Sequence, residues 1–219
     1  MTDFLNTYFY GFDTRVYELV CGVQNEFLNV VANIFANFGN IRAFLVYVVI
    51  ALVLCCFKKT RKYGISLAFA LAIGSLITNM ILKPWIARPR PYVGLKDTPF
   101  WNTYEAFYTY AGSHLEGDKS FPSGHTTVAF ESSVSLFSTA RSDGHKWAYI
   151  LLVLAVIMGL SRIYLCVHYP TDVIGGLIIG AIGGIIGGLL VNWFYKHDEH
   201  KLNKAYINFS FANLFKKKA

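Results

Sequence analysis

The sequence predicts an all-α, polytopic integral membrane protein, a bundle of six transmembrane helices that forms one domain over residues 1–219. Hydrophobic residues make up 54% of the 219 residues and charged residues 15%, and the mean hydropathy is +0.41. Soluble domains carry about 25% charged residues. Several apolar runs approach the roughly 20 residues that a helix needs to cross a bilayer. No polar linker separates these runs, which favours a single domain.

The first candidate span, Thr14–Phe38, is the weakest of the six. Asn25, Asn29, Asn33 and Asn37 recur every fourth residue and form one polar stripe on a helix whose other faces are apolar. Two interpretations are open. A first span whose asparagines face protein is slightly favoured over a helix that lies in the membrane interface.

Five further apolar runs are predicted to span the membrane, although polar residues restrict some of them. The first is short and reaches span length only if Arg42 lies at the boundary. The third run contains His125 and Glu131, so it cannot face lipid on every side. Arg162 places the last turn of the fourth run at a boundary or inside protein. In order, the runs are Ala43–Phe57, Tyr63–Leu82, Phe121–Ala140, Trp147–Val167 and Val173–Tyr195.

Basic clusters beside the apolar runs predict the topology. The formal charge is +7, and much of the excess lies in Lys58–Lys62 and in residues 196–219. Cytoplasmic flanks of membrane proteins carry such clusters, so both segments are expected in the cytoplasm, the second as a basic tail. This distribution disfavours nucleic acid as a partner. Alternation of the spans then places Lys83, Phe121 and Val167 together on the extracytoplasmic side of the cell membrane.

Glycines recur at four-residue intervals in the last predicted span, at Gly176, Gly180, Gly184 and Gly188. A seam of this kind lets two helices approach each other closely. Packing inside the bundle is the favoured interpretation, and a homodimer through this seam is the alternative.

Three short motifs lie at the predicted extracytoplasmic ends of the spans. Among their residues are two histidines, three cations, a serine next to a glycine, and an aspartate, which are the groups needed to hold a phosphoryl group, attack it and protonate what leaves. The sequence therefore points to an enzyme that removes phosphate from a lipid at the membrane surface. The motifs are Lys83-x6-Arg90-Pro91, Pro122-Ser123-Gly124-His125 and Ser161-Arg162-x5-His168-x3-Asp172.

The third motif predicts a paired histidine and aspartate. Proline belongs in the first turn of a helix and holds the preceding residue extended, so the last span should begin near Pro170, with Asp172 in its first turn and His168 just outside. The carboxylate can then reach one ring nitrogen of His168 and leave the other free to attack. Such a pair alone is more often structural, but Arg162 at the same membrane end favours catalysis.

The second motif predicts a helix N-terminus that binds an anion. Pro122 is expected to open the helix, and Gly124 lets a ligand approach backbone N–H groups that have no partner within the helix. Ser123 adds a hydroxyl donor, and His125 can give its proton to a leaving oxygen as a general acid. A plain helix cap with a solvated histidine is the alternative when this motif is considered alone.

The first motif predicts cations held by a stiff backbone, because three prolines alternate with Lys83, Arg88 and Arg90. Lys83 and Arg90 are expected to bind phosphate, since the positive-inside rule does not account for a basic cluster on the outer side. Arg88 is expected to contact lipid headgroups. The cysteines show no CxxC spacing and the carboxylates no compact cluster, so neither a metal nor another cofactor is expected.

The segment between the first two motifs is rich in aromatic residues. A belt at the membrane interface is the favoured interpretation, and a lid over a lipid entrance is the alternative. The aromatic residues are Phe100, Trp101, Tyr104, Phe107, Tyr108 and Tyr110.

Three other polar residues are assigned structural roles. His114 and Glu116 are expected to belong to loop structure. Glu131 lies roughly 240° around the helix from His125 at 100° per residue, which predicts a hydrogen bond inside the bundle.

In their order and spacing, the motifs resemble the signature of the phosphatidic acid phosphatase type 2/haloperoxidase superfamily over about Lys83–Asp172, and the surrounding spans resemble its six-helix membrane branch. The resemblance implies that His168 forms a phosphohistidine, that Asp172 supports it and that His125 is the acid. It further implies that phosphate is bound by Lys83, Arg90, Ser123, Gly124 and Arg162.

The predicted function is a metal-independent phosphatase that acts on a lipid phosphate or diphosphate at the outer membrane face, with other membrane lipids around it. An isoprenoid diphosphate such as undecaprenyl diphosphate is the preferred substrate, and phosphatidylglycerophosphate and phosphatidate are alternatives. Two other classes are considered. Membrane burial disfavours a vanadate haloperoxidase-like enzyme, and the intact pair of His125 and His168 disfavours a non-catalytic lipid-binding or transport protein.

Overall fold

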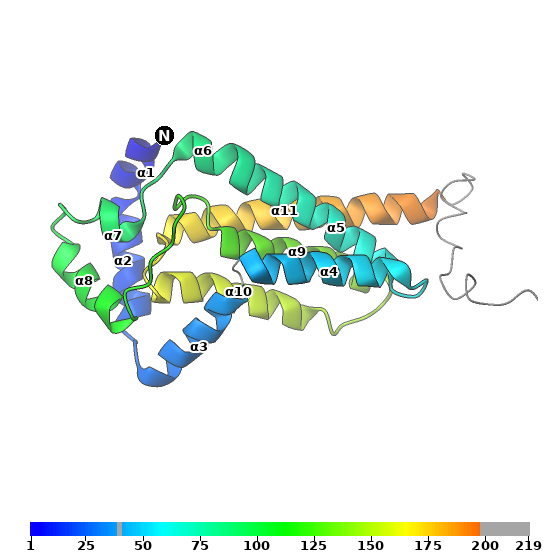
Figure 1. Ribbon diagram of the computed structural model, residues 1–219, viewed down its shortest axis with the longest axis horizontal. Helices are drawn as coiled ribbons and strands as arrows, with labels where there is room; N and C mark the ends of the chain where they lie inside the picture. Colours follow the sequence, from blue (N-terminus) through cyan, green and yellow to red (C-terminus); the bar gives the residue numbers. More distant parts are fainter. Residues whose placement is uncertain (39–40, 198–219) are drawn as a thin grey trace, which may run out of the picture.

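The computed structural model describes residues 1–38 and 41–197, and all regular structure in this part of the chain is helical, as predicted. Five long helices, α4, α5, α9, α10 and α11, lie along the long axis of the molecule, and shorter helices gather at one end (Figure 1). The elements are α1 (Thr2–Tyr8), α2 (Tyr10–Cys21), α3 (Glu26–Asn37), α4 (Ile41–Cys56), α5 (Arg61–Ser75), the π-helical η1 (Leu76–Leu82), α6 (Lys83–Ile86), α7 (Pro91–Gly94), α8 (Trp101–Tyr110), α9 (Gly124–Ser142), α10 (Tyr149–Tyr164) and α11 (Pro170–Lys196).

The helix lengths agree with a membrane protein but give fewer full spans than six. Among the described residues, two helical segments are long and apolar enough to cross a membrane, Arg61–Gly94 and Pro170–Lys196. The bent pair of α2 and α3 would add a third. The apolar helices Phe44–Cys56 and Tyr149–Tyr164 are shorter. Six transmembrane helices therefore remain a prediction.

α9 shows why a helix of the bundle can be rich in polar residues. It packs against α5, α10 and α11, and 11 of its residues are buried, so protein rather than lipid covers most of its surface. Glu131 is fully buried, and its Oε1 accepts a hydrogen bond from Ser75 Oγ of α5 at 3.1 Å. The predicted hydrogen bond inside the bundle is confirmed.

The N-terminal segment does not form the continuous helix expected over Thr14–Phe38. α2 and α3 are bent by 118° relative to each other. Asn25 is extended between them, and its side chain caps α3 by accepting the Leu28 N–H at 2.9 Å. Farther along α3, Asn33 Nδ2 donates to the Asn29 carbonyl at 2.8 Å. Asn25 therefore satisfies one of the N–H groups that the break leaves without partners at the start of a short helix.

The glycine seam of α11 lies inside the bundle. A Cβ at Gly180 would come within 2.5 Å of the Thr127 carbonyl oxygen of α9, and one at Gly187 within 2.6 Å of the Ser66 carbonyl oxygen of α5. The predicted packing within the bundle is confirmed, because only glycine leaves room for backbones this close. A homodimer stays a prediction.

The aromatic segment packs inside the protein, so the expected interfacial belt is wrong for its central residues. Tyr104 is fully buried and Tyr108 nearly so, in one cluster with Tyr17 of α2. The hydroxyls of Tyr104 and Tyr17 donate to the carbonyls of Cys166 and His168, each at 2.7 Å. These buried hydroxyls fix the loop that precedes α11.

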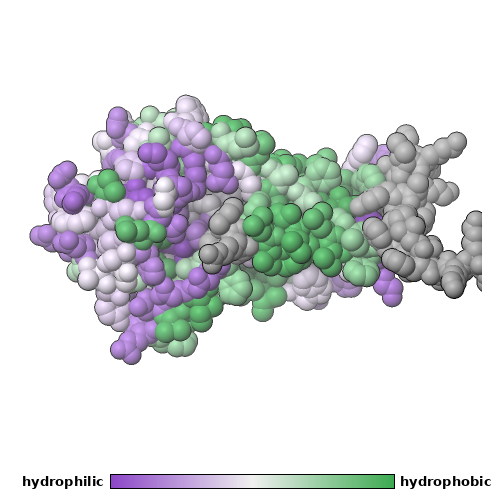
Figure 2. Space-filling model, viewed as in Figure 1, coloured by the Kyte–Doolittle hydropathy of each residue, from purple (hydrophilic) through white to green (hydrophobic). Residues whose placement is uncertain are grey.

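The ends of the bundle differ in character. At one end, Lys62 Nζ donates to Asp143 Oδ1 at 2.6 Å, which joins the first turn of α5 to the residue that follows α9. The three motifs lie at the other end, as the alternation of spans requires. Figure 2 shows hydrophilic residues over that end and an apolar belt beside it over the long helices. The basic tail from residue 198 onward lies outside the described residues, and the side on which each end lies remains a prediction.

Candidate active site

A cavity of about 640 Å³ lies at the end of the bundle where the motifs meet. The continuous segment α5–η1–α6 and the helices α9, α10 and α11 bring their motif-bearing ends together there. All three motifs contribute to its wall, although they are far apart in the sequence. The motif residues that line it are Lys83, Arg90, Gly124, His125, Arg162 and His168.

His168 lies in the loop before α11 and is 1% exposed. Its Nε2 is 2.8 Å from Arg90 Nη1, and its Nδ1 is 3.5 Å from Asp172 Oδ2. A guanidinium only donates hydrogen bonds, so Nε2 must accept. The proton of the neutral ring then belongs on Nδ1, beside the carboxylate, and the lone pair of Nε2 lies on the side of the cations.

The pKa of His168 is lowered to about 3. Burial is the main cause, and the positive charge of Arg90 adds to it, while Asp172 offsets only part of the effect. The imidazole is therefore neutral at physiological pH. Neutrality is what a nitrogen nucleophile requires.

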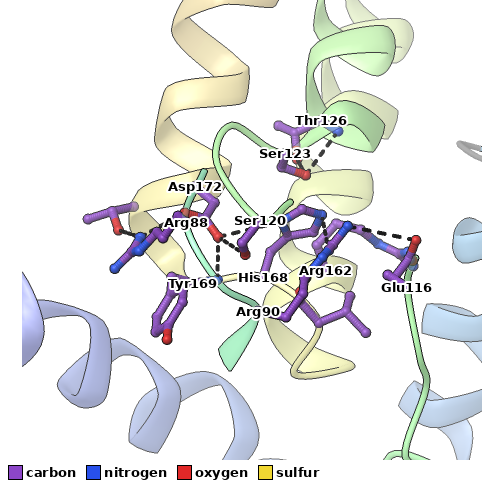
Figure 3. A network of polar contacts seen from close by, with 12 residues as sticks. Arg88, Arg90, Glu116, Ser120, Ser123, Thr126, Arg162, His168, Tyr169 and Asp172 are labelled. Atoms are coloured by element: carbon purple, nitrogen blue, oxygen red, sulfur yellow. Dashed lines mark hydrogen bonds and ion pairs between the residues drawn. The ribbon is translucent and has the colours of Figure 1, made fainter. Parts of the chain in front are cut away.

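Asp172 is in the first turn of α11, with Pro170 at the helix start and His168 just outside, as the sequence predicts. Its Oδ2 accepts the Tyr169 N–H at 3.0 Å and the hydroxyl of Ser120, while its Oδ1 accepts Arg88 Nη1 at 2.7 Å (Figure 3). The carboxylate closes a capping box. These contacts hold it rigidly next to the imidazole.

Three cations face the cavity from nearly buried positions. The side chains of Lys83, Arg90 and Arg162 are 11%, 4% and 2% exposed. Nη2 of Arg162 is buried and has no hydrogen-bond partner among the described residues. Because buried donors are nearly always paired, this free donor on a fixed cation suits an oxygen of an anionic ligand.

The second motif does start a helix, but two residues later than expected. Ser123, rather than Pro122, is the N-terminal cap of α9, and its Oγ accepts from Thr126 Oγ1 at 2.9 Å and Thr126 N at 3.4 Å (Figure 3). The Ser123 side chain is thus buried next to the cavity rather than lining it. Gly124 and His125 reach the wall, and a Cβ at Gly124 would lie 3.5 Å from Lys83 Nζ.

Arg88 does not contact lipid headgroups, and this expectation is wrong. Its guanidinium is 1% exposed, pairs with Asp13 at 2.9 Å and Asp172 at 2.7 Å, and lies 3.7 Å from the centre of the Tyr169 ring. Asp13 also accepts the Thr171 N–H at 2.9 Å. Arg88 therefore ties α2 to the start of α11 and orients Asp172. The sequence contains no local signal for the role of Asp13.

Two acidic residues of the loop before α9 also face the cations. Asp118 pairs with both Lys83 and Arg90, and Glu116 Oε1 and Oε2 lie 3.8 and 3.9 Å from Arg162 and Arg90. Sequence reasoning placed Glu116 in loop structure and did not single out Asp118. Their position between the basic first motif and the second motif is the signal that could have found them, because three clustered cations require counter-charges.

Part of the remaining cavity wall is apolar, and Asn37, Ser75, Asn79 and His114 add polar side chains to it. Phe44 of α4, Val128 of α9, and Leu165 and Val167 of the loop between α10 and α11 contribute hydrophobic side chains. A cation-lined wall next to an apolar one suits an amphiphile with an anionic headgroup. Across residues 1–38 and 41–197, no group of three or more His, Cys, Asp and Glu side chains is arranged to hold a metal ion.

Comparison with known proteins agrees with this geometry. The profile of the PAP2 superfamily matches residues 63–198. An undecaprenyl-diphosphatase of Sulfolobus acidocaldarius is 31% identical over 172 residues, 78% of this chain and 74% of that protein. Two crystal structures share the fold. Aquifex aeolicus LpxE has a TM-score of 0.59 and 27% identity over 79% of this chain and 92% of that one. A PAP2-type phosphatidylglycerolphosphate phosphatase of Bacillus subtilis has a TM-score of 0.63 and 26% identity over 88% of each chain. The resemblance of the three motifs is thereby confirmed, and the chain belongs to the PAP2 superfamily.

Proposed function

We propose that this chain is a membrane phosphatase that hydrolyses a lipid phosphate or diphosphate, with an isoprenoid diphosphate such as undecaprenyl diphosphate as the best candidate substrate. One observation carries most weight: the neutral His168 Nε2 faces a nearly buried set of three cations, one of which has a free donor. Membership of the PAP2 superfamily and the similarity to an undecaprenyl-diphosphatase support the same conclusion.

In the first step, His168 Nε2 attacks the terminal phosphorus and the bond from phosphorus to the leaving oxygen breaks. His125 donates a proton to that oxygen, and the proton on Nδ1 of His168 stays beside Asp172, whose charge stabilises the imidazolium. Lys83, Arg90 and Arg162 bind the phosphoryl oxygens, because phosphoryl transfer depends mainly on positioning and on stabilisation of charge. The products are phosphohistidine and the dephosphorylated lipid or lipid monophosphate.

In the second step, water attacks the phosphohistidine. His125, now neutral, accepts a proton from the water, the bond between phosphorus and Nε2 breaks, and inorganic phosphate leaves. The backbone N–H groups at the start of α9, next to Gly124 and with Ser123 as the cap, add donors at the positive end of the helix dipole. Three cations supply the charge stabilisation, so the reaction is proposed to need no metal.

The apolar wall of the cavity supports a lipid rather than a soluble phosphate ester. Phe44 of α4 and Val128 of α9 line the cavity, and in this proposal an isoprenoid or acyl chain enters sideways from the bilayer between these two helices. In this proposal residues 1–219 act as one domain whose active site is extracytoplasmic and whose basic tail is cytoplasmic.

A phosphate-release assay on purified, detergent-solubilised protein tests the proposal. Undecaprenyl diphosphate, phosphatidylglycerophosphate and phosphatidate would be compared in the presence of EDTA. His168→Ala should abolish turnover, whereas His145→Ala, an exposed histidine after α9, should leave it unchanged. Unaltered turnover in His168→Ala would indicate contaminating activity or another mechanism, and loss of activity in EDTA would refute the metal-free step.

Substrate identity and intermediate need separate readouts. The ratio of kcat/KM values across the three lipids decides between the isoprenoid diphosphate and the glycerophospholipids. Rapid quenching with a 32P-labelled substrate should trap label on the protein, and the label should be absent from His168→Ala. Halide oxidation that depends on added vanadate would instead support a haloperoxidase-like activity.

A further inference from the structure

We propose that Glu116 and Asp118 are specificity-determining residues: their carboxylates occupy the place of the substrate's anionic oxygens in the ligand-free protein, and a ligand binds by displacing the loop that carries them. This inference rests on the proposed phosphatase function and extends it to the choice among phosphorylated lipids.

The two carboxylates contact all three of the proposed phosphate-binding cations. Asp118 pairs with Lys83 Nζ and Arg90 Nη2, and its backbone carbonyl accepts Arg90 Nε at 3.0 Å. Glu116 lies 3.8 Å from Arg162 Nη1, the contact drawn in Figure 3, and 3.9 Å from Arg90 Nη2. Partial burial opposes ionisation of Asp118, but Lys83 and Arg90 outweigh it and lower its pKa below the usual value. Both cation pairs are therefore intact at neutral pH.

The two carboxylates are more exposed than the cations with which they pair. The side chains of Asp118 and Glu116 are 51% and 26% exposed, whereas those of the three cations are at most 11% exposed. The cations belong to the floor of the site and the carboxylates to its mouth. Gly117 between them has no atom within 4 Å of the place where a Cβ would stand, so the loop faces open space at this point. The carboxylates can leave while the cations stay.

The loop also divides the space available to a ligand. A second cavity, of about 760 Å³, lies beside the first, and both are lined by Asn79, Lys83, Arg90 and residues 116–118. The loop is therefore a wall between two cavities. Its displacement would join them and give the headgroup a path to the cations.

A ligand must replace two carboxylates to occupy the cations. A phosphomonoester or diphosphate carries about two or more negative charges at neutral pH, whereas the phosphodiester of an ordinary membrane lipid carries one. Displacing the loop costs every ligand the same free energy and so raises the Kd of all anions by one factor. A singly charged phosphodiester, which binds the cations more weakly, then no longer fills the site. This kind of selection acts through competition for the cations rather than through new contacts. It would keep abundant bilayer lipids out of an active site that opens to the bilayer.

Isothermal titration calorimetry with inorganic phosphate tests the competition directly. Asp118→Asn should bind phosphate on the order of three- to tenfold more tightly than the wild type, because a partly exposed ion pair no longer competes. Asp97→Asn removes the same charge from an exposed position on the same outer segment and should not change Kd. Unchanged or weaker binding by Asp118→Asn would overturn the competition and show that Asp118 positions the cations.

A second variant tests displacement without removing a charge. The Tyr92 hydroxyl donates to the Glu116 carbonyl at 2.9 Å and accepts the Glu116 N–H at 3.2 Å. Tyr92→Phe removes both contacts and should also tighten phosphate binding. Phosphate should accelerate hydrogen exchange at the Glu116 amide of the wild type. Exchange that phosphate slows or leaves unchanged would overturn the proposed displacement.

The selectivity is tested with dimethyl phosphate, a soluble phosphodiester. Glu116→Gln/Asp118→Asn should gain affinity for dimethyl phosphate by about the same factor as for phosphate, and a dimethyl phosphate affinity that the substitutions leave unchanged would overturn the role of the loop in excluding phosphodiesters. These results are separable from the proposed function. If the wild type and every variant fail to bind phosphate, the phosphatase proposal itself falls and the loop proposal with it.

Discussion

At the scale of single residues, the contacts of the two ring nitrogens determine how His168 can react. Asp172 lies beside Nδ1 and Arg90 donates to Nε2. The sequence predicted the first contact, because Pro170 sets the helix start and so the separation of the pair. It could not predict the second, because Arg90 comes from a distant loop. The same Arg90 is expected both to bind phosphate and to keep the nucleophile unprotonated.

Replacement of Arg90 should therefore change the pH dependence as well as the rate. His168 attacks only when neutral. Burial is the larger cause that lowers its pKa to about 3, and the charge of Arg90 adds to this effect. Arg90→Gln should lower kcat/KM by about 10²–10³ and move the acid limb of its pH profile upward, because the His168 pKa rises toward its ordinary value. The profile of kcat/KM reports the free enzyme. An acid limb that stays in place would contradict the assigned contact.

Replacement of Arg88 should lower the stability of the folded protein. The arginine is enclosed by Asp13 and Asp172, so Arg88→Gln leaves two buried carboxylates without their cation. The free energy of unfolding should fall by about 3–5 kcal/mol, measured by denaturant titration in detergent. Arg15→Gln is the matched control, because the Arg15 side chain is 72% exposed and pairs with Glu18 on the same helix. A comparable loss in both variants would contradict the buried network.

At the scale of elements, the helix ends place the chemistry and the glycines of α11 allow the helices to converge. Ser123 caps α9, and the box formed by Tyr169 and Asp172 caps α11. Such caps are local, so the sequence located both starts to within a few residues. The break between α2 and α3 is different. Nothing in the apolar periodicity of the segment marks a bend, and only its packing against the rest of the bundle reveals it.

The close packing of α11 against α9 predicts a strong effect of one methyl group. A Cβ at Gly180 would lie 2.5 Å from the Thr127 carbonyl oxygen and 2.8 Å from the Phe130 Cβ, so the helices must separate. Gly180→Ala should destabilise the protein by about 1–3 kcal/mol. Gly11→Ala in α2, where nothing lies within 4 Å, should be neutral or stabilising by up to about 1 kcal/mol. Thermal unfolding in detergent compares the two variants.

At the scale of the whole molecule, the proposed topology predicts which end of the bundle is accessible from outside the cell. Lys96 and Lys146 are exposed and lie toward opposite ends. With a membrane-impermeant maleimide on intact cells, Lys96→Cys should be labelled, and Lys146→Cys only after permeabilisation. Wild-type protein controls for its own cysteines, of which Cys21 and Cys166 are buried. The reverse pattern would place the active site in the cytoplasm.

By itself, the sequence determined the all-helical membrane character, the helix starts at the second and third motifs, and the residue types at the site. These depend on composition, on caps and prolines that act over one turn, and on charge relative to apolar runs. Only the tertiary structure decided that Arg88 is buried against Asp13, that the aromatic segment packs on the loop of His168, and that Glu116 and Asp118 cover the cations. Each of these depends on a partner distant in sequence, and neither spacing nor hydropathy encodes which distant groups will meet.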